Sequence, residues 1–144
     1  DHRRARARDF GASDIGNSGT SDWRDQVLAL TDGLGVDVAI EAVGTPITFT
    51  MATEIVRPGG SVANVGVHGR PVELKLNELW IQNIDISMGL VNTNTLPMLL
   101  KLVAAHRLPA DKFVTHEFGF DQVEEAYDVF GHAAEHDALK VLIH

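Results

Sequence analysis

Cysteine is absent from this chain of 144 residues. Its absence excludes a disulfide framework, a thiolate zinc site and a cysteine nucleophile made from these residues. Long apolar runs are missing too, since none approaches the roughly 20 residues that a membrane-spanning helix needs, and no signal peptide is visible. We therefore expect a soluble, cytoplasmic protein.

Positive charge is scarce. The chain has 12 Lys and Arg against 20 Asp and Glu, which gives a formal net charge of −8. No basic stripe is present to contact phosphates, so we expect no nucleic-acid partner. The single basic cluster, Arg3–Arg8, is interpreted as a solvated helix face. With 44% hydrophobic and 22% charged residues, the composition is that of a globular protein.

The glycine-rich loop that binds dinucleotide phosphates is also missing. Such a loop has the pattern G-x-G-x-x-G and lies between a strand and a helix. The nearest match, Gly33-Leu34-Gly35, precedes a predicted strand and lacks the third glycine. We interpret it as a turn.

Seven histidines are present and raise the possibility of a metal site. His132 and His136 are four residues apart, a spacing that places two ligands on one helix face, but no third ligand is suitably spaced. His116 is interpreted as structural or solvent-facing, and His106 as a positive charge near a helix C-terminus. We predict no metal site in this chain.

Hydrophobic periodicity predicts alternating helices and strands in the first half. A helix over residues 2–10 ends at Gly11, and Thr45 with Pro46 begins a helix that carries Ile47, Met51 and Ile55 on one face. The other predicted elements are a strand over 14–17, a helix over 22–31, a strand over 36–44 that is buried on both faces, and a strand over 61–67. This order indicates an α/β fold with a doubly wound parallel sheet.

In the second half, the strand over residues 84–90 alternates apolar Ile84, Ile86 and Met88 with polar residues, which is typical of an edge strand. A helix over 94–108 has an apolar stripe that begins at Leu96. It is followed by a strand over 112–120, a helix over 121–130 with a capping box from Asp121 to Glu124, and a strand over 138–144.

Two predicted strands end in glycine-containing segments, Glu41–Thr45 and Val65–Gly69. Ligands bind at the carboxyl ends of strands in open α/β sheets, and glycine lets a ligand approach the backbone. Tight turns without a ligand explain the same pattern. The residues alone leave both interpretations open.

Several segments, taken together, resemble a known family. The stretches "DHRRARARDFGASDI", "GVDVAIEAVGTPITFTMATEIVRPGGSVANVGVHG", "ISMGLVNTNTLPMLLKLV" and "KFVTHEFGFDQVEEAYDVF" are similar, in order and spacing, to the zinc-dependent alcohol dehydrogenases of the medium-chain dehydrogenase/reductase (MDR) superfamily. The resemblance implies the back half of a Rossmann sheet, with C-terminal strands and helices that join the catalytic domain. Residues 1–90 would be the nucleotide-binding portion and residues 91–144 the segment that packs toward the catalytic domain.

The resemblance also implies a nicotinamide cofactor site. On the family pattern, Arg3 matches a basic position near the adenosine ribose, and Lys140 matches one near the pyrophosphate. The remaining implied cofactor contacts are Ala42, Val43 and Gly44 on the adenine side, Val65, Gly66 and Val67 beside the nicotinamide, and Met88 and Leu90 as a second backbone contact. NAD(P) is the implied cofactor, with NAD favoured, and the substrate is a small-molecule alcohol or aldehyde.

The family's zinc ligands and proton-relay groups match no residue here, so no catalytic or metal residue is assigned. The chain has no initiator Met and starts inside a predicted helix, so we expect it to be part of a longer protein and inactive by itself. The resemblance further implies a homodimer, or a dimer of dimers, through the 84–90 edge strand. Other interpretations stay open: a polyol or threonine dehydrogenase, a zinc-free quinone reductase, or a non-enzymatic nucleotide-binding or assembly module.

Overall fold

The computed structural model describes residues 2–144, and Asp1, where the first predicted domain begins, lies outside them. The chain divides into two compact units. We call Gly16–Asn92 the sheet unit, and we call the residues up to Ile15 together with Thr93–His144 the terminal unit. The division between residues 90 and 91 that the sequence suggests stays a prediction.

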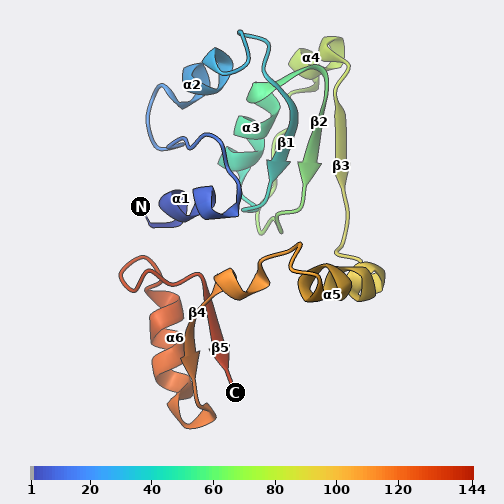
Figure 1. Cartoon of the computed structure of the whole chain (residues 1–144). Coiled ribbons are helices and arrows are strands. Elements are labelled where there is room, and N and C mark those ends of the chain that lie inside the picture. Colours follow the sequence, from blue (N-terminus) through green and yellow to red (C-terminus); the bar gives the residue numbers. More distant parts are fainter. Residues whose placement is uncertain (1) are drawn as a thin grey trace. The chain divides into compact units, whose positions relative to one another are not determined.

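The sheet unit confirms the predicted α/β class. Its three strands are parallel and lie in the order β1-β2-β3 (Figure 1). The elements in chain order are α2 (Trp23–Ala29), β1 (Val36–Glu41), α3 (Pro46–Ile55), β2 (Val56–Asn64), α4 (Leu76–Leu79), η2 (Trp80–Gln82) and β3 (Asp85–Met88). The chain therefore repeats the strand-helix-strand rhythm expected of parallel pairing.

Helix α3 begins where the sequence predicts. The Thr45 hydroxyl accepts the Thr48 N–H at 3.3 Å, the Thr48 hydroxyl in turn accepts the Thr45 N–H at 3.4 Å, and Pro46 takes the first helical position. This reciprocal pair satisfies two of the N–H groups that a helix start leaves free. The helix packs its Ala52 against Ala39 and Val62 of the sheet, which places the hydrophobic core between α3 and one sheet face.

The opposite face of β1 is not covered, and the prediction that this strand is buried on both faces is wrong for the described chain. Ala39 and Glu41 are buried, whereas Val38 is 54% and Ile40 is 68% exposed. Side chains alternate between the two faces of a strand, and α3 covers only one of them. An apolar run therefore indicates two-sided burial only when a second layer is present.

Strand β2 differs from the predicted 61–67 at both ends. Val36 pairs with Val56, but Val38 pairs with Ser61, so the segment between them forms an irregularity inside β2 instead of a turn before it. At the other end the strand stops at Asn64, because the Val65 and Gly66 N–H groups both donate to the Glu41 carbonyl. Strand β1 likewise ends at Glu41, three residues earlier than predicted.

Strand β3 lies at the end of the sheet order, so the predicted edge position is confirmed. It is shorter than the predicted 84–90, and it pairs with β2 from Asp85 to Met88. Ile84 and Ile86 pack against the core, while Met88 is 69% exposed.

The terminal unit has its own small core, formed by Val129, Ala133 and Ala138 with Phe118 and Val141 packed against them. Its two strands are parallel. The elements are α1 (His2–Ala7), η1 (Arg8–Phe10), η3 (Thr93–Thr95), α5 (Leu96–Ala104), η4 (Ala110–Phe113), β4 (Val114–Phe118), η5 (Phe120–Gln122), α6 (Val123–Gly131) and β5 (Lys140–Ile143). Among residues 2–144, no helix combines the length and the apolarity that crossing a bilayer requires.

Two further sequence predictions are wrong. Residues 14–17 form no strand, since no other strand of the described chain lies beside them to complete a ladder. Asp121 and Glu124 form no capping box. Instead the Gly119 N–H donates to Gln122 Oε1 at 3.3 Å, one turn before α6, whose N-cap Gln122 makes no side-chain cap bond.

Helix α5 confirms the predicted helix within 94–108, but its apolar stripe is not buried. Leu96 is 52% and Leu100 is 59% exposed, and α5 has no buried residue. Amphipathic spacing predicts the helix correctly, because the backbone pattern is local. Burial of the stripe is not predicted by this local pattern, because it depends on which other elements pack against the helix.

Candidate functional site

The carboxyl ends of β1, β2 and β3 lie along one edge of the sheet unit, because the three strands are parallel (Figure 1). Open α/β sheets bind ligands at this edge. Eight of the ten sequence-predicted cofactor residues lie at or just beyond these ends: Ala42, Val43, Gly44, Val65, Gly66, Val67, Met88 and Leu90. The structure thus gathers most of the predicted site into one place.

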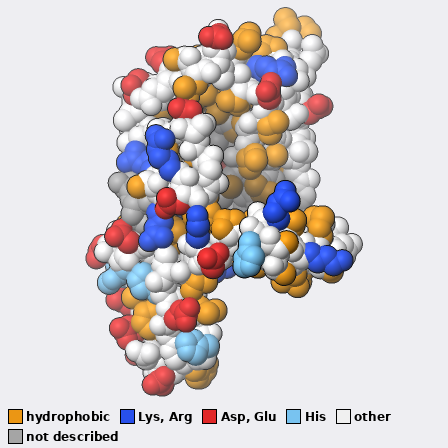
Figure 2. Space-filling model, viewed as in Figure 1, with side chains coloured by type: hydrophobic (Ala, Val, Ile, Leu, Met, Phe, Trp, Pro, Cys, Tyr) orange, Lys and Arg blue, Asp and Glu red, His pale blue; other side chains and the backbone are white. Residues whose placement is uncertain are grey.

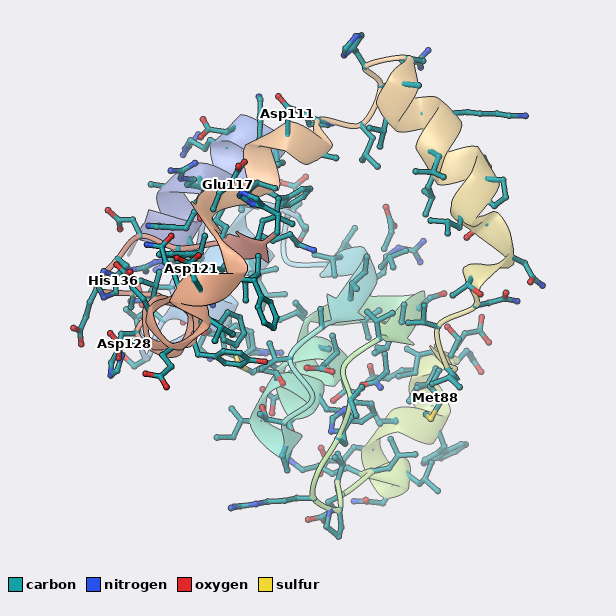
Figure 3. All side chains as sticks on the ribbon, turned by 90° about the horizontal axis from the view of Figure 1, so that it is seen from below. Met88, Asp111, Glu117, Asp121, Asp128 and His136 are labelled. Carbon is teal, nitrogen blue, oxygen red and sulfur yellow. The ribbon has the colours of Figure 1, made fainter. Side chains whose placement is uncertain are left out.

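The two basic residues are not part of this group. Arg3 lies in α1, and Lys140 is the first residue of β5, so both belong to the terminal unit. Their assignments stay predictions. Met88 lies at the end of β3 in the sheet unit (Figure 3).

Glu41, the last residue of β1, organises the strand ends. Its side chain is fully buried, and its Oε1 accepts three hydrogen bonds: from the Val43 and Gly44 N–H groups, each at 2.8 Å, and from the Thr48 hydroxyl at 2.7 Å. A buried carboxylate is tolerated only when such donors replace water. The carboxylate therefore joins the turn after β1 to the first turn of α3.

The pKa of Glu41 reflects a balance of opposing causes. Burial raises the pKa, whereas the hydrogen bonds from Thr48, Gly44 and Val43 and the electrostatic interaction with His68 lower it. The donors together outweigh burial, so the pKa of Glu41 lies below its ordinary value. Glu41 is consequently an ionised group at neutral pH.

The two glycines of the strand ends are required by the close packing of one turn on the other. Gly44 adopts a φ of +86°, and a Cβ there would overlap the backbone of Val67. A Cβ on Gly66 would overlap the Glu41 carboxylate and the backbone of Gly44. The tight-turn explanation thus accounts for both glycines, and it leaves the outward side of the turns free for a ligand.

A second polar cluster follows β2. The Asn64 amide donates to the Gly66 carbonyl at 3.1 Å, and its Oδ1 lies 2.8 Å from His68 Nε2. His68 Nε2 is also 3.4 Å from Glu41 Oε2, and the ring meets Phe49 edge-on at a centroid distance of 6.1 Å. Asn64 and His68 therefore fix the turn after β2 as Glu41 fixes the turn after β1.

The outward side of these turns is apolar. Val43 is 67%, Val65 55%, Val67 88% and Leu90 96% exposed. Exposed valines at adjacent strand ends suit the flat face of an aromatic ring, and backbone groups at the same place suit its polar substituents. The strand ends therefore fit one side of a nicotinamide or adenine ring.

Further apolar surface continues from this edge along the outer side of β1. A hollow of ≈ 380 Å³ is lined by residues of β1, α2 and α3, among them Trp23, Val27, Val38, Ile40 and Met51. Hydrophobic side chains are visible over the strands of the sheet unit and on α5 in the space-filling view (Figure 2). Exposed patches of this kind mark surfaces that bind another element or molecule.

Zinc does not fit the described chain. No group of three or more His, Asp or Glu side chains in residues 2–144 could hold a metal ion. His132 Nδ1 instead contacts the Asp128 carbonyl at 3.0 Å and its carboxylate at 3.2 Å. The hydrogen bond to the Asp128 backbone, with the charges of Asp128 and Glu135, raises the pKa of His132. Asp128 and His136 are marked in Figure 3.

Sequence reasoning missed four polar residues of the site: Glu41, Thr48, Asn64 and His68. A signal was present for Glu41, because an acid stands at the end of a mostly apolar strand and is followed by the turn sequence "AVG". A carboxylate at that place binds backbone N–H groups much as an N-cap does. No local pattern indicates that Thr48 and His68 approach Glu41, or that Asn64 contacts His68.

Comparison with known proteins places the chain among dehydrogenases. A family model described as zinc-binding dehydrogenase matches residues 1–105. An alcohol dehydrogenase of Cupriavidus necator is 31% identical over 147 residues, covering 99% of this chain and 40% of that protein. An NADP-dependent isopropanol dehydrogenase of Thermoanaerobacter brockii is 38% identical over 128 residues, covering 84% of this chain and 36% of the relative.

A solved structure is similar over nearly the whole chain. The zinc dependent alcohol dehydrogenase 2 from Streptococcus pneumonia, in its apo form, superimposes with a TM-score of 0.92 and 48% sequence identity. The match covers 97% of this chain and 41% of that one. The chain thus spans about two fifths of the length of the proteins it matches.

Proposed function

This chain belongs to the zinc-binding dehydrogenase family, and from that premise we propose that the complete protein is an NAD(P)-dependent, zinc-dependent alcohol dehydrogenase. The printed names of the relatives support an alcohol as the substrate class. This chain would supply part of the surface that binds and orients the cofactor.

One observation carries the proposal: three parallel strand ends gather exposed valines and closely packed turns at the edge where α/β sheets bind ligands. A nicotinamide, when bound, accepts or donates the hydride in such a reaction. The part of this chain is to hold one side of the nicotinamide ring and to exclude water from it with Val65 and Val67, while Val43 lies on the adenine side. Arg3 and Lys140 are proposed to contact the ribose and the pyrophosphate.

Only the family membership supports zinc as the metal of the complete protein. The described residues supply no ligand set, so we derive no step through the metal from this chain. In the complete protein, a metal would be held by residues outside residues 2–144, and its task would be to polarise the alcohol oxygen.

The test is a cofactor-reduction assay on the complete protein with a panel of alcohols. We expect oxidation of at least one primary or secondary alcohol, with loss of activity on removal of zinc by a chelator and recovery on its return. No alcohol oxidation, together with NAD(P)H-dependent reduction of a quinone that survives zinc removal, would instead indicate a zinc-free quinone reductase. Oxidation of only a polyol or of threonine would place the protein in another branch of the MDR superfamily.

Binding of a nucleotide without turnover of any alcohol would support the non-enzymatic alternative.

The preference for NAD over NADP is the finer part of the proposal, and titration of the complete protein with both nucleotides decides it. The NADP-dependence stated in the name of the Thermoanaerobacter relative makes this comparison informative. A cytoplasmic location is likewise proposed and is checked by cell fractionation.

We further propose that two subunits pair through the free edge of β3. An unpaired edge strand presents N–H and C=O groups to another chain, and a two-fold axis makes a single such edge sufficient. Only Asp85 places a charge on this strand. Lysine on an edge opposes pairing, so Ser87→Lys should raise the dimer dissociation constant at least tenfold, roughly 1.4 kcal/mol.

Analytical ultracentrifugation of the complete protein measures this effect. Ser21→Lys, at an exposed position outside the strands, is the matched control and should leave the constant unchanged. An unaltered dimer in the Ser87→Lys variant would exclude pairing through β3.

A further inference from the structure

Glu41 is the only acidic residue among the buried residues of the described chain. It is 2% exposed and lies directly behind the turns that form the candidate site. A buried carboxylate costs stability unless it is fully hydrogen-bonded, so a simple hydrophobic core does not call for one at this position. The hydrogen bonds of Glu41 indicate that this residue holds the strand-end turns together.

Glu41 accepts hydrogen bonds from four backbone N–H groups of the two strand-end turns. Its side chain binds those of Val43 and Gly44, and its main-chain carbonyl binds those of Val65, at 2.8 Å, and Gly66, at 3.1 Å. All four donors therefore point inward. The outward side of each turn carries an exposed valine side chain, Val43 in one and Val65 in the other, which suits the flat face of a ligand.

The second carboxylate oxygen has a different role. Glu41 Oε2 is buried without a hydrogen-bond partner among the described residues, and it lies 3.4 Å from His68 Nε2 and against the Cα of Gly66. His68 in turn contacts Asn64, whose amide binds the Gly66 carbonyl. The charge of Glu41 thus orients the turn after β2 as well as the turn after β1.

We propose that Glu41 is a positioning residue for the cofactor: it never touches the ligand, but it sets the backbone of residues 43–44 and 65–66 in the orientation that binds the nicotinamide dinucleotide. The inference rests on the proposed function for the identity of the ligand. Thr48 is the partner that holds the carboxylate in place from α3, through the 2.7 Å hydrogen bond.

The test compares Glu41→Gln with Glu54→Gln in the complete dehydrogenase. Gln keeps the size of the side chain but removes the charge and places an amide where one carboxylate oxygen was. Glu54 is an exposed residue of α3 and serves as the matched control. We expect Glu41→Gln to raise the KM for the nucleotide about tenfold while kcat at saturating nucleotide changes less than about threefold.

Thr48 offers a second route if Glu41→Gln fails to fold. Thr48→Val removes the hydroxyl and should raise the same KM, whereas Thr48→Ser retains it and should restore a value near that of the wild type. A purely structural role for Glu41 predicts a lower melting temperature with an unchanged nucleotide KM in the folded variants, and that result would overturn the proposal.

Amide hydrogen exchange separates this proposal from the proposed function. Exchange at Val43, Gly44, Val65 and Gly66 should be slow in the wild type and faster in Glu41→Gln, whatever ligand the protein binds. Unchanged exchange at these amides would refute the positioning role. A wild type that binds no nicotinamide nucleotide would refute the proposed function and, with it, the ligand named for Glu41.

Discussion

At the scale of single residues, Glu41 illustrates how a buried charge can be retained in a fold. Three donors on Oε1 replace the water that the carboxylate loses, and they stabilise the ionised form against the protonated one. The price of burial is therefore offset only while the group is ionised. The free energy of unfolding of the sheet unit should therefore fall when the pH becomes acidic enough to protonate Glu41.

The sign of that dependence follows from the direction of the pKa shift. The pKa of Glu41 is lowered from its ordinary value of 4.5, so its contribution to stability is complete above pH 4.5 and is lost as the pH falls through the lower folded value. Glu41→Gln should be less stable than the wild type at neutral pH, and the difference should narrow below pH 4.5. Urea unfolding at a series of pH values measures both. A constant difference down to acid pH would contradict the ionised, hydrogen-bonded state.

Gly66 gives a second prediction at the residue scale. Gly66→Ala would place a methyl group against the Glu41 carboxylate and the Gly44 backbone, and it should lower the free energy of unfolding by about 2 kcal/mol. Gly69, three residues on, has no atom within 4 Å of such a methyl group, so Gly69→Ala is the matched control and should be nearly neutral. Denaturant midpoints of the two variants check the contrast. Equal midpoints would mean that the turns do not pack as described.

At the scale of elements, the start of α3 and the start of α5 form a natural comparison. Both have Thr at the N-cap followed within two residues by Pro, but only Thr45 makes a side-chain cap bond. Thr95 makes none. The same residue types thus stabilise one helix start and leave the other without a side-chain cap.

Thr45→Ala should therefore cost about 1 kcal/mol of stability, the usual value for the loss of an N-cap side chain. Thr95→Ala should cost much less, because no cap bond is removed. Thermal or chemical unfolding of the two variants measures the difference. A loss of stability in Thr95→Ala as large as in Thr45→Ala would show that the cap bond is not the cause.

At the scale of the whole molecule, exposed apolar surface is the main feature that the chain leaves without a partner. It occurs on the outer side of β1 in the sheet unit and on α5 in the terminal unit. The chain covers only about two fifths of the length of its Cupriavidus and Streptococcus relatives. We expect the remainder of the complete protein to cover part of this surface.

The same reasoning gives a prediction for residues 1–144 expressed alone. They should neither oxidise alcohols nor hold stoichiometric zinc, because no ligand triad is present in the described chain. Metal analysis after dialysis and a cofactor-reduction assay test the two statements. One tightly bound zinc per chain, or alcohol oxidation above the level of a blank, would contradict them.

The sequence by itself determined the features that depend on neighbours along the chain. The 3.6-residue period predicts α3 and α5, and Thr45 and Pro46 predict the start of α3. An apolar run predicts β1, and alternation of apolar with polar residues predicts β3. The order of these elements establishes the α/β class and brings three strand ends to one edge. Most of the candidate cofactor surface follows from that order alone, since parallel strands end on the same side.

Only the tertiary structure decided what depends on neighbours in space. Residues 14–17 were predicted as a strand, yet a strand requires a partner for its backbone, and local sequence does not reveal whether one is present. Val38 and Ile40 were predicted to be buried and are exposed, because no second layer of the described chain covers their face of β1 and local sequence does not reveal this. Glu41 meets Thr48, which lies in the first turn of the next helix along the chain, but it meets His68 only because β1 and β2 lie side by side. Pairing and packing across the sheet join residues 27 positions apart, and no periodicity along the chain encodes that contact.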